Sequence, residues 1–277
     1  MKAFMIYIFI LNLFLASLLA TESITPHEKH IVIVSTGHNN ALWYRWNLDS
    51  VYRQNYTNYE LRYCDDGSTD GTFEHVNSYV KECGQEHRTM LVHNEVRYGS
   101  AIENQYHMIH QCDPHDIIII LDADDHLAHP DVLSYINNIY DDPHVWMTFG
   151  QYRVYPEGYI GQSREIPAYI VEHNAFREYP FVQSHLRTFR AALFQKICPE
   201  DFMYQGNWMR MAGDVAAMIP MCEMACYGHI RFIPDILLDY NGINPINDHK
   251  ISQQLQGAID QYIRTKPRYE PLEKLFD

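Results

Sequence analysis

Two acidic clusters, each directly after an apolar run, constrain the fold of this chain more than any other sequence feature. Residues 65–72 read DDGSTDGT and follow the apolar segment 59–64, while residues 122–125 read DADD and follow four isoleucines at 117–120. Short apolar runs of this kind are typical of buried strands. Carboxylates at the carboxyl ends of such strands repel one another and lose hydration. A cation or a polar ligand is therefore expected among them.

The rest of the sequence alternates between apolar runs and segments with helical spacing of their apolar residues. The first half predicts strands at 30–35, 59–64, 90–92 and 117–120 and helices at 40–54, 70–83, 99–111 and 130–140. The second half predicts a long strand over 145–155, a loop-rich stretch to 184 and helices over 187–197 and 213–226. This order predicts an α/β fold with a doubly wound, mostly parallel sheet. The length of 277 residues is enough for one core or for two halves that share a sheet.

The composition and the missing motifs argue against several function classes. The net charge of −14, without any basic run, argues against nucleic acid as a partner. The chain has no G-x-G-x-x-G, P-loop or G-x-S-x-G motif, which argues against dinucleotide oxidoreductases, P-loop kinases and α/β-hydrolases. Segment 36–41 also lacks the glycine-rich basic loop of a sugar-nucleotide pyrophosphorylase.

Residues 1–22 have the pattern of a targeting segment. Met1 and Lys2 precede an apolar stretch over 3–20 that is interrupted only by Asn12 and Ser17. Its length fits either a cleaved signal peptide or a signal anchor, and both remain open. We therefore expect export or membrane anchoring, in the secretory pathway or the cell envelope. The six cysteines permit disulfides in an exported chain, but their spacing fits no zinc site, and buried thiols are expected for most of them.

The spacing of Asp122 and Asp124 suits a divalent cation bound to a diphosphate. Mg²⁺ and Mn²⁺ prefer oxygen ligands, usually one or two carboxylates together with phosphate oxygens. Calcium loops are the alternative for both clusters. Asn77 stands where the first loop would require glutamate, and His126 and Leu127 stand where the second would require an oxygen ligand and glycine. Asp66 is expected to bind a nucleobase or ribose, whereas residues 68–70 are suited to capping the helix that follows.

The segments 50–72 and 121–131 resemble the family-2 glycosyltransferases of the GT-A fold, and the match extends over about residues 30–135. The resemblance implies a Rossmann-like, mostly parallel sheet flanked by helices in a single domain. It implies a nucleotide-sugar-binding half over 28–142 and an acceptor-binding, catalytic half over 143–277.

The same resemblance implies a function. It implies a metal-dependent, inverting transferase that moves a hexosyl or N-acetylhexosaminyl group from a nucleotide-diphosphate-sugar to a hydroxyl of a glycan, lipid or protein. A UDP-sugar is the favoured donor and Mn²⁺ or Mg²⁺ the expected metal. The Q-x-x-R-W motif of the processive branch is absent, so non-processive transfer is expected. The alternative is a relative that binds a nucleotide-sugar or a glycan without transfer.

Individual roles follow from the positions of the motifs. The resemblance implies nucleotide-sugar contacts for Thr36, Asp66, Arg97, Asn104 and Asp122, and metal contacts for Asp122, Asp124, Asp125 and His249. Asp214, which follows a Gly-Asn-Trp segment at 206–208, corresponds to the family's catalytic base, with helix N-capping as the alternative. His185 and Arg187 lie in a polar segment, and are expected either to face the diphosphate or acceptor or to end a solvent-exposed helix.

Overall fold

The computed structural model describes residues 28–276, without the side chains of Asp248 and His249. The predicted signal peptide or anchor at residues 1–22 lies outside the described residues. Within the described part of the chain, no helix is both long enough and apolar enough to cross a membrane.

An eight-stranded sheet forms the centre of the molecule, with the strand order β3-β2-β1-β4-β7-β6-β10-β5. Its strands are β1 (Ile31–Gly37), β2 (Tyr59–Asp65), β3 (Thr89–His93), β4 (Ile117–Ile120), β5 (His126–Leu127), β6 (Met147–Tyr155), β7 (Arg187–Arg190) and β10 (Ile230–Asn241). The first four strands of this order pair in parallel, as do β6 and β10, whereas β7 and β5 pair antiparallel with their neighbours. The sheet is therefore mostly parallel, as the sequence predicts.

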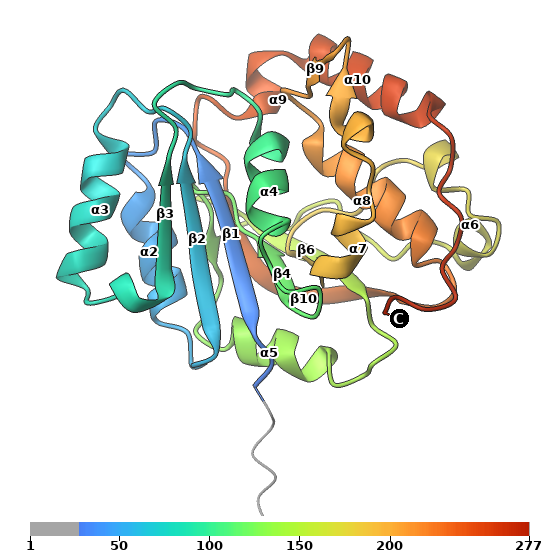
Figure 1. Cartoon of the computed structure of the whole chain (residues 1–277), viewed down its shortest axis with the longest axis horizontal. Coiled ribbons are helices and arrows are strands. Elements are labelled where there is room, and N and C mark those ends of the chain that lie inside the picture. Colours follow the sequence, from blue (N-terminus) through green and yellow to red (C-terminus); the bar gives the residue numbers. More distant parts are fainter. Residues whose placement is uncertain (1–27, 277) are drawn as a thin grey trace, which may run out of the picture.

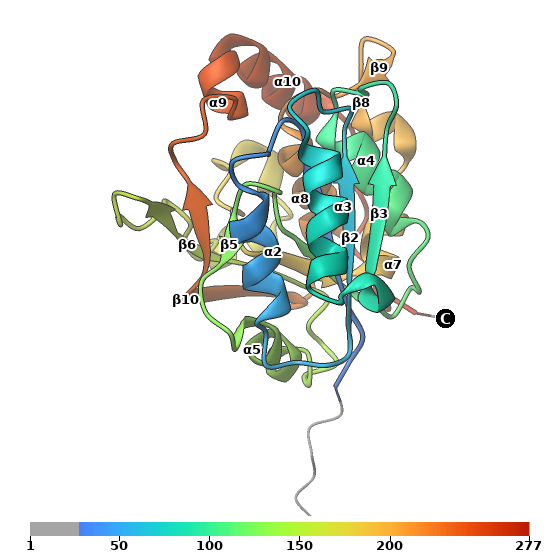
Figure 2. The same cartoon turned by 90° about the vertical axis from the view of Figure 1, so that its left-hand side faces the viewer.

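Helices cover both faces of the sheet within a single domain. The longer ones are α2 (Tyr44–Tyr52), α3 (Thr72–Glu82), α4 (Ala101–Ile109), α5 (Val132–Ile139), α8 (Gly213–Met224) and α10 (Gln253–Thr265). Shorter elements are α6 (Ala168–Glu172), α7 (Ala191–Gln195), α9 (Asp248–Ile251) and the small ladder of β8 (Met203–Tyr204) and β9 (Asn207–Trp208). Figure 1 looks onto the face with α4, α7 and α8, and Figure 2 shows α2 and α3 on the other side.

The alternation of side chains along the strands explains why two cores form. Ile31 and Ile33 of β1 pack with α2, α3 and α5, whereas Val32 and Val34 pack with α4, α7 and α8. The isoleucines of β4 divide in the same way, because successive side chains of a strand point to opposite faces. Strands that are buried on both faces are continuously apolar, which is the pattern seen in the sequence.

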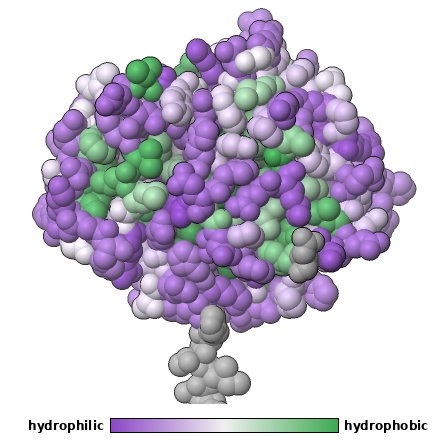
Figure 3. Space-filling model, in the orientation of Figure 1, coloured by the Kyte–Doolittle hydropathy of each residue, from purple (hydrophilic) through white to green (hydrophobic). Residues whose placement is uncertain are grey.

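The surface seen from the side of Figure 1 is largely polar. Figure 3 shows a mostly hydrophilic face on which apolar residues lie in scattered patches.

All six cysteines are free thiols, so no disulfide joins any part of the described chain. Four of them, Cys64, Cys112, Cys222 and Cys226, are buried, as expected.

The prediction of one helix over residues 187–197 is wrong. Residues 187–190 form β7, which pairs antiparallel with β4 and β6, and only Ala191–Gln195 form a helix. The hydroxyl of Thr188 in β7 hydrogen bonds to the hydroxyls of Thr148 at 2.7 Å and Tyr140 at 2.9 Å. This polar strand is stabilised by tertiary partners that local sequence does not reveal.

Candidate active site

A cleft of about 320 Å³ opens where the parallel strands end. Because β1, β2 and β4 run in parallel, the two acidic clusters that follow β2 and β4 reach the same edge of the sheet. The cleft is lined by most of the residues predicted from the sequence: Thr36, Asp66, Arg97, Asn104, Asp122, Asp124, His185, Arg187 and Asp214. Asp125 lies directly behind this lining, and the side chain of His249 lies outside the described residues.

Asp66 is held by a ring of donors from the loop after β3. Its Oδ1 accepts from Asn94 Nδ2 at 2.8 Å and from the backbone N–H of Tyr98 at 2.9 Å, and its Oδ2 accepts from the N–H of Gly99 at 2.8 Å. Burial raises the pKa of Asp66, but these hydrogen bonds outweigh it and hold the pKa below its ordinary value. Gly67 is required beside it, because a Cβ there would lie 2.9 Å from the Arg97 nitrogen.

Two other polar side chains of this part of the cleft have unsatisfied atoms. Among the described residues, neither Thr36 Oγ1 nor Asn104 Nδ2 has a hydrogen-bond partner, although both atoms are buried. Asn104 is fixed in place because its Oδ1 accepts from Asn94 at 2.9 Å. Buried polar atoms are rarely left unpaired, so these two indicate a place for a polar ligand.

The second acidic cluster forms a tight loop that is held from two sides. Asn47 of α2 donates from its Nδ2 to the carbonyls of Asp122 at 3.1 Å and Asp125 at 3.0 Å. From the β10 side, the N–H of Asn241 donates to Asp125 Oδ1 at 2.7 Å, and Asn244 donates to Asp124 Oδ2 at 2.7 Å.

The carboxyl groups of this loop all carry raised pKa values. Burial raises the pKa of Asp124 to about 6, although the hydrogen bond from Asn244 opposes the shift. Burial and the neighbouring aspartates raise the pKa of Asp125 well above its ordinary value, and burial also raises that of Asp122. Shifts in this direction mean that burial disfavours the charged forms of these carboxyl groups, whereas a cation close to them would favour the charged forms.

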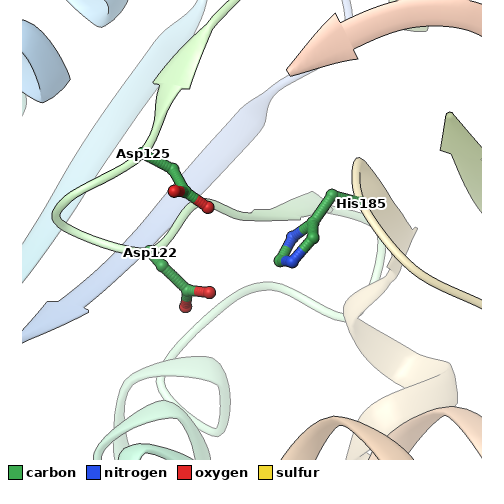
Figure 4. Close-up of side chains that lie close together, drawn as sticks. All are labelled: Asp122, Asp125 and His185. Carbon is green, nitrogen blue, oxygen red and sulfur yellow. The ribbon is translucent and has the colours of Figure 1, made fainter. Parts of the chain in front are cut away.

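Asp122, Asp125 and His185 form a cluster with the donor atoms of a metal site (Figure 4). One ligand atom from each residue lies within 4.8 Å of the other two. Asp125 Oδ2 is buried without a partner in residues 28–276, and burial together with the nearby Arg187 lowers the pKa of His185 well below 6.5. A neutral imidazole and two carboxylates fit a divalent cation.

Arg187 joins the acidic loop to Asp214. Its Nη1 donates to Asp214 Oδ2 at 2.9 Å, and its Nη2 lies 3.3 Å from His185 Nδ1 and 3.8 Å from Asp122 Oδ2. The Arg187 side chain is only 6% exposed, whereas that of Asp214 is 37% exposed and lines the cleft. Both His185 and Arg187 are thus buried at the cleft, and the alternative of a solvent-exposed helix end is wrong.

Asp214 lies in the first turn of α8, whose N-cap residue is Ala212, so Asp214 is not the N-cap itself. Its Oδ1 nevertheless accepts from the N–H of Val215 at 2.9 Å, so the carboxylate also binds a free N–H group of this first turn. The preceding residue, Gly213, packs against α4, where an added Cβ would lie 2.8 Å from Ile102 Cβ. This close approach leaves no room for a larger residue at position 213.

Sequence reasoning missed three asparagines that build the site, namely Asn47, Asn94 and Asn244. Asn47 offered a signal, because it lies on the same side of α2 as the buried Tyr44, Leu48 and Val51. A polar residue on such an apolar face is usually hydrogen bonded to buried groups.

The doubly wound sheet, with its acidic cleft at the carboxyl edge, has the GT-A architecture of nucleotide-sugar-dependent enzymes. The family model of glycosyl transferase family 2 matches residues 30–198, which is more than half of the chain. The chain therefore belongs to glycosyl transferase family 2. No curated protein matches the sequence.

Several solved structures share the fold. S. aureus TarS 1–349 in complex with UDP-GlcNAc is 15% identical, with a TM-score of 0.61 over 84% of this chain and 65% of that chain. A longer S. aureus TarS structure is 16% identical, with a TM-score of 0.57 over 78% of this chain and 37% of that chain. The mannosyltransferase PcManGT from Pyrobaculum calidifontis, in complex with GDP-Man and Mn²⁺, is 19% identical, with a TM-score of 0.51 over 76% and 56%. The chain thus covers 37 to 65% of the lengths of these structures.

Proposed function

We propose that the protein is a metal-dependent, inverting and non-processive glycosyltransferase. It moves a hexosyl or N-acetylhexosaminyl group from a nucleotide-diphosphate-sugar, preferably a UDP-sugar, to a hydroxyl of a glycan, lipid or protein. One observation carries the proposal: Asp66, the Asp122–Asp125 loop and Asp214 line or adjoin one cleft. The UDP-GlcNAc of TarS and the GDP-Man and Mn²⁺ of PcManGT support it.

The nucleotide is assigned to the part of the cleft around Asp66. Asp66 is an oriented acceptor for the N–H of a base or a ribose hydroxyl, and its lowered pKa keeps it ionised at neutral pH. The unpaired Thr36 Oγ1 and Asn104 Nδ2 supply further contacts. Arg97, whose Nε lies 3.9 Å from Asp66 Oδ2, is half-exposed and can reach a phosphate or the base.

The cation is assigned to the acidic loop. Asp122 and Asp125, with His185, offer the closest set of ligand atoms, and Asp124 lines the cleft beside them. His249 remains a proposed ligand on the resemblance alone. A bound Mn²⁺ or Mg²⁺ would neutralise the diphosphate leaving group. Arg187 places a second positive charge next to this position.

Asp214 is assigned as the general base. It is partly exposed in the cleft, and Arg187 fixes its orientation through one oxygen. An acceptor hydroxyl within hydrogen-bond reach would lose its proton to this carboxylate as it attacks the anomeric carbon opposite the diphosphate. One such displacement inverts the anomeric configuration.

Binding without transfer is the second candidate, and one observation favours it. The buried Arg187 guanidinium lies 2.9 Å from Asp214 Oδ2, so it competes with an acceptor hydroxyl for the lone pairs of the proposed base.

A donor screen with purified full-length protein decides between the two candidates. Release of nucleoside diphosphate from UDP- and GDP-sugars is measured with Mn²⁺, with Mg²⁺ and with excess chelator. We expect acceptor-dependent release with metal and almost none with chelator or in Asp124→Ala. Glu172→Ala, an exposed acid on α6, serves as the control. Full activity in chelator would exclude the metal, and tight donor binding without any release would favour the binding protein.

We also propose that residues 1–22 export the protein or anchor it to a membrane. This proposal rests on the apolar stretch in the sequence. Cell fractionation of the full-length chain, beside a chain that lacks residues 1–22, tests it. Full-length protein that is recovered uncleaved from the cytosol, free of membrane, would contradict it.

A further inference from the structure

A second cavity, of about 370 Å³, lies outside the proposed active site, between α2 and the strand β5 that follows the acidic loop. Figure 2 looks onto this side of the molecule. The residues that matter here are Trp46, Asp49, Arg53, His126, His129 and Tyr155. A cavity of this volume, with aromatic walls and a few polar groups, has the properties of a small-ligand site.

Three rings form a corner of this cavity. The ring centroid of Trp46 lies 5.1 Å from that of Tyr155 at an interplanar angle of 80°, and 6.2 Å from that of His126 at 63°. His126 and Tyr155 are 6.1 Å apart at 76°. Trp46 and Tyr155 nevertheless stay 39% and 37% exposed, so the corner offers uncovered aromatic surface to a ligand.

Charged groups of both signs and a histidine also line the cavity. Arg53 donates from Nη2 to Asp49 Oδ2 at 3.1 Å, and its side chain is 75% exposed, so its other N–H groups can reach a ligand. Asp49 is oriented because the Tyr79 hydroxyl donates to its Oδ1 at 2.5 Å. His129 Nδ1 accepts from the N–H of Asp131 at 3.3 Å, which leaves the N–H of Nε2 as a donor.

These groups together select the chemistry of the ligand. A purely apolar ligand would strip water from Asp49 and Arg53 without replacing their hydrogen bonds, which is unfavourable. Asp49 and Arg53 form an ion pair, so both charges are present in the cavity. A ligand of either sign would therefore lie close to a charge of its own sign. The remaining class is a neutral molecule with an apolar face and many hydroxyls.

We propose that this cavity binds a pyranose unit of a neutral glycan, at a site separate from the transfer site. The C–H face of the sugar ring packs on Trp46 and Tyr155, and its hydroxyls hydrogen bond to Asp49, Arg53 and His129. Aromatic surface supplies much of the binding energy at such sites. The inference does not depend on transfer and holds equally for a protein that only binds glycans.

Saturation-transfer NMR on the full-length protein tests the proposal without donor or turnover. The probes are methyl glycosides of glucose, galactose, mannose and N-acetylglucosamine, together with maltotriose and chitotriose. We expect saturation of sugar C–H protons for at least one probe, with a dissociation constant in the millimolar range. Trp46→Ala weakens this binding about tenfold or more, and Trp46→Phe, which keeps a ring, weakens it less. Tyr227→Ala removes an exposed aromatic elsewhere, at 63% exposure, and leaves binding unchanged.

Three outcomes contradict the proposal. If no probe binds, or if Trp46→Ala and Tyr227→Ala bind alike while both remain folded by circular dichroism, the cavity is not a glycan site. Trp46-dependent binding to phosphatidylcholine vesicles without any sugar signal would assign this surface to a membrane instead. Loss of nucleoside diphosphate release in the donor screen, with sugar binding retained, would overturn the proposed transfer and leave this site intact.

Discussion

Asp66 and Asp124 belong to the same residue type, but their hydrogen-bond donors give them opposite properties. Three donors surround the Asp66 carboxylate and hold its pKa below the ordinary value. Among the side chains that the structure describes, Asn244 alone donates to Asp124, and burial raises the pKa of Asp124 to about 6. The first carboxylate is therefore a fixed, ionised acceptor, whereas burial disfavours the charged form of the second.

Asp66→Asn separates these two roles. The NH₂ group of asparagine would face the N–H groups of Tyr98 and Gly99, so this loop loses hydrogen bonds. We expect binding of the nucleotide-sugar to weaken by about 1–3 kcal/mol, with Mn²⁺ affinity almost unchanged. Calorimetric titrations with donor and with Mn²⁺ measure both values. Lost metal affinity together with unchanged donor affinity in metal-free buffer would show that Asp66 is a metal ligand.

Asp214→Asn tests the general base. Asparagine keeps an Oδ1 that can accept from the N–H of Val215, so the substitution preserves the first turn of α8. Turnover is expected to fall by about 10²- to 10⁴-fold with donor affinity nearly unchanged. Single-turnover kinetics, calorimetry of donor binding and NMR of the product's anomeric centre provide the measurements. An active variant, or a product that retains the donor's configuration, would contradict the mechanism.

The sequence predicts much of the site at this scale because its aspartates follow recognisable strands. The two clusters and Asp214 reach the cleft from positions that strand order and motif spacing already imply. The partners of these residues could not be predicted. Asn94, Asn244 and the pairing of Arg187 with Asp214 come from segments that only the tertiary fold brings together.

At the level of secondary structure, α2 connects two regions of the molecule. Asn47 holds the acidic loop, and Trp46, the preceding residue, lines the second cavity. Ser50 in the same helix accepts from the N–H of Leu127 at 3.0 Å, which fixes β5 as well. The geometry of the acidic loop therefore depends on this nine-residue helix on one side and on Asn241 and Asn244 on the other.

Asn47→Ala tests this dependence. Asn47 is fully buried, and its loss leaves the carbonyls of Asp122 and Asp125 without their side-chain donor. We expect a loss of about 1–3 kcal/mol in the free energy of unfolding and weaker Mn²⁺ binding. Denaturant unfolding and metal titration measure the two effects. Asn138→Ala, an exposed helical asparagine, is the control and should change neither; equal effects from both variants would refute the role of Asn47.

The prediction of secondary structure from local sequence fails where a strand depends on its neighbours in the sheet. The four residues of β7 form a strand because β4 and β6 flank them, although their local pattern also fits a helix. β10 was not predicted, because Pro234 interrupts its apolar run. The register shift between Ile233 and Ile236 accommodates that proline. By contrast, the strands β1 to β4 and the helices α2 to α5 have strong local periodicity, and the sequence predicts them to within a few residues, although it does not predict the short strand β5.

At the scale of the whole molecule, a buried ion pair attaches the C-terminal segment to the core. Arg177 donates to both carboxylate oxygens of Glu223 at 2.6 and 2.8 Å, and its Nη1 donates to the carbonyl of Ile263 in α10. Glu223 also accepts from the N–H of Tyr269 at 3.0 Å. Both charged side chains are at most 3% exposed.

Glu223→Gln should destabilise the protein strongly. It leaves the buried Arg177 charge without its counter-charge, which costs about 3–5 kcal/mol in the free energy of unfolding. The control is Glu178→Gln, whose exposed partner is Arg268 and whose expected cost is about 0–1 kcal/mol. Denaturant unfolding curves of both variants give the comparison. Similar losses for both would show that burial of the Arg177–Glu223 pair contributes nothing.

The strand order also determines when each strand of the sheet can pair during synthesis. Strands β1 to β4 occupy neighbouring places in the sheet, so they can pair as soon as β4 has left the ribosome. Within the described chain, β5 pairs with β10 alone, and β10 begins only at Ile230. A nascent chain therefore carries the Asp122–Asp125 loop between a paired strand and an unpaired one until β10 has been synthesised. A chain that stalls before β10 also lacks the hydrogen bonds that Asn241 and Asn244 donate to this loop.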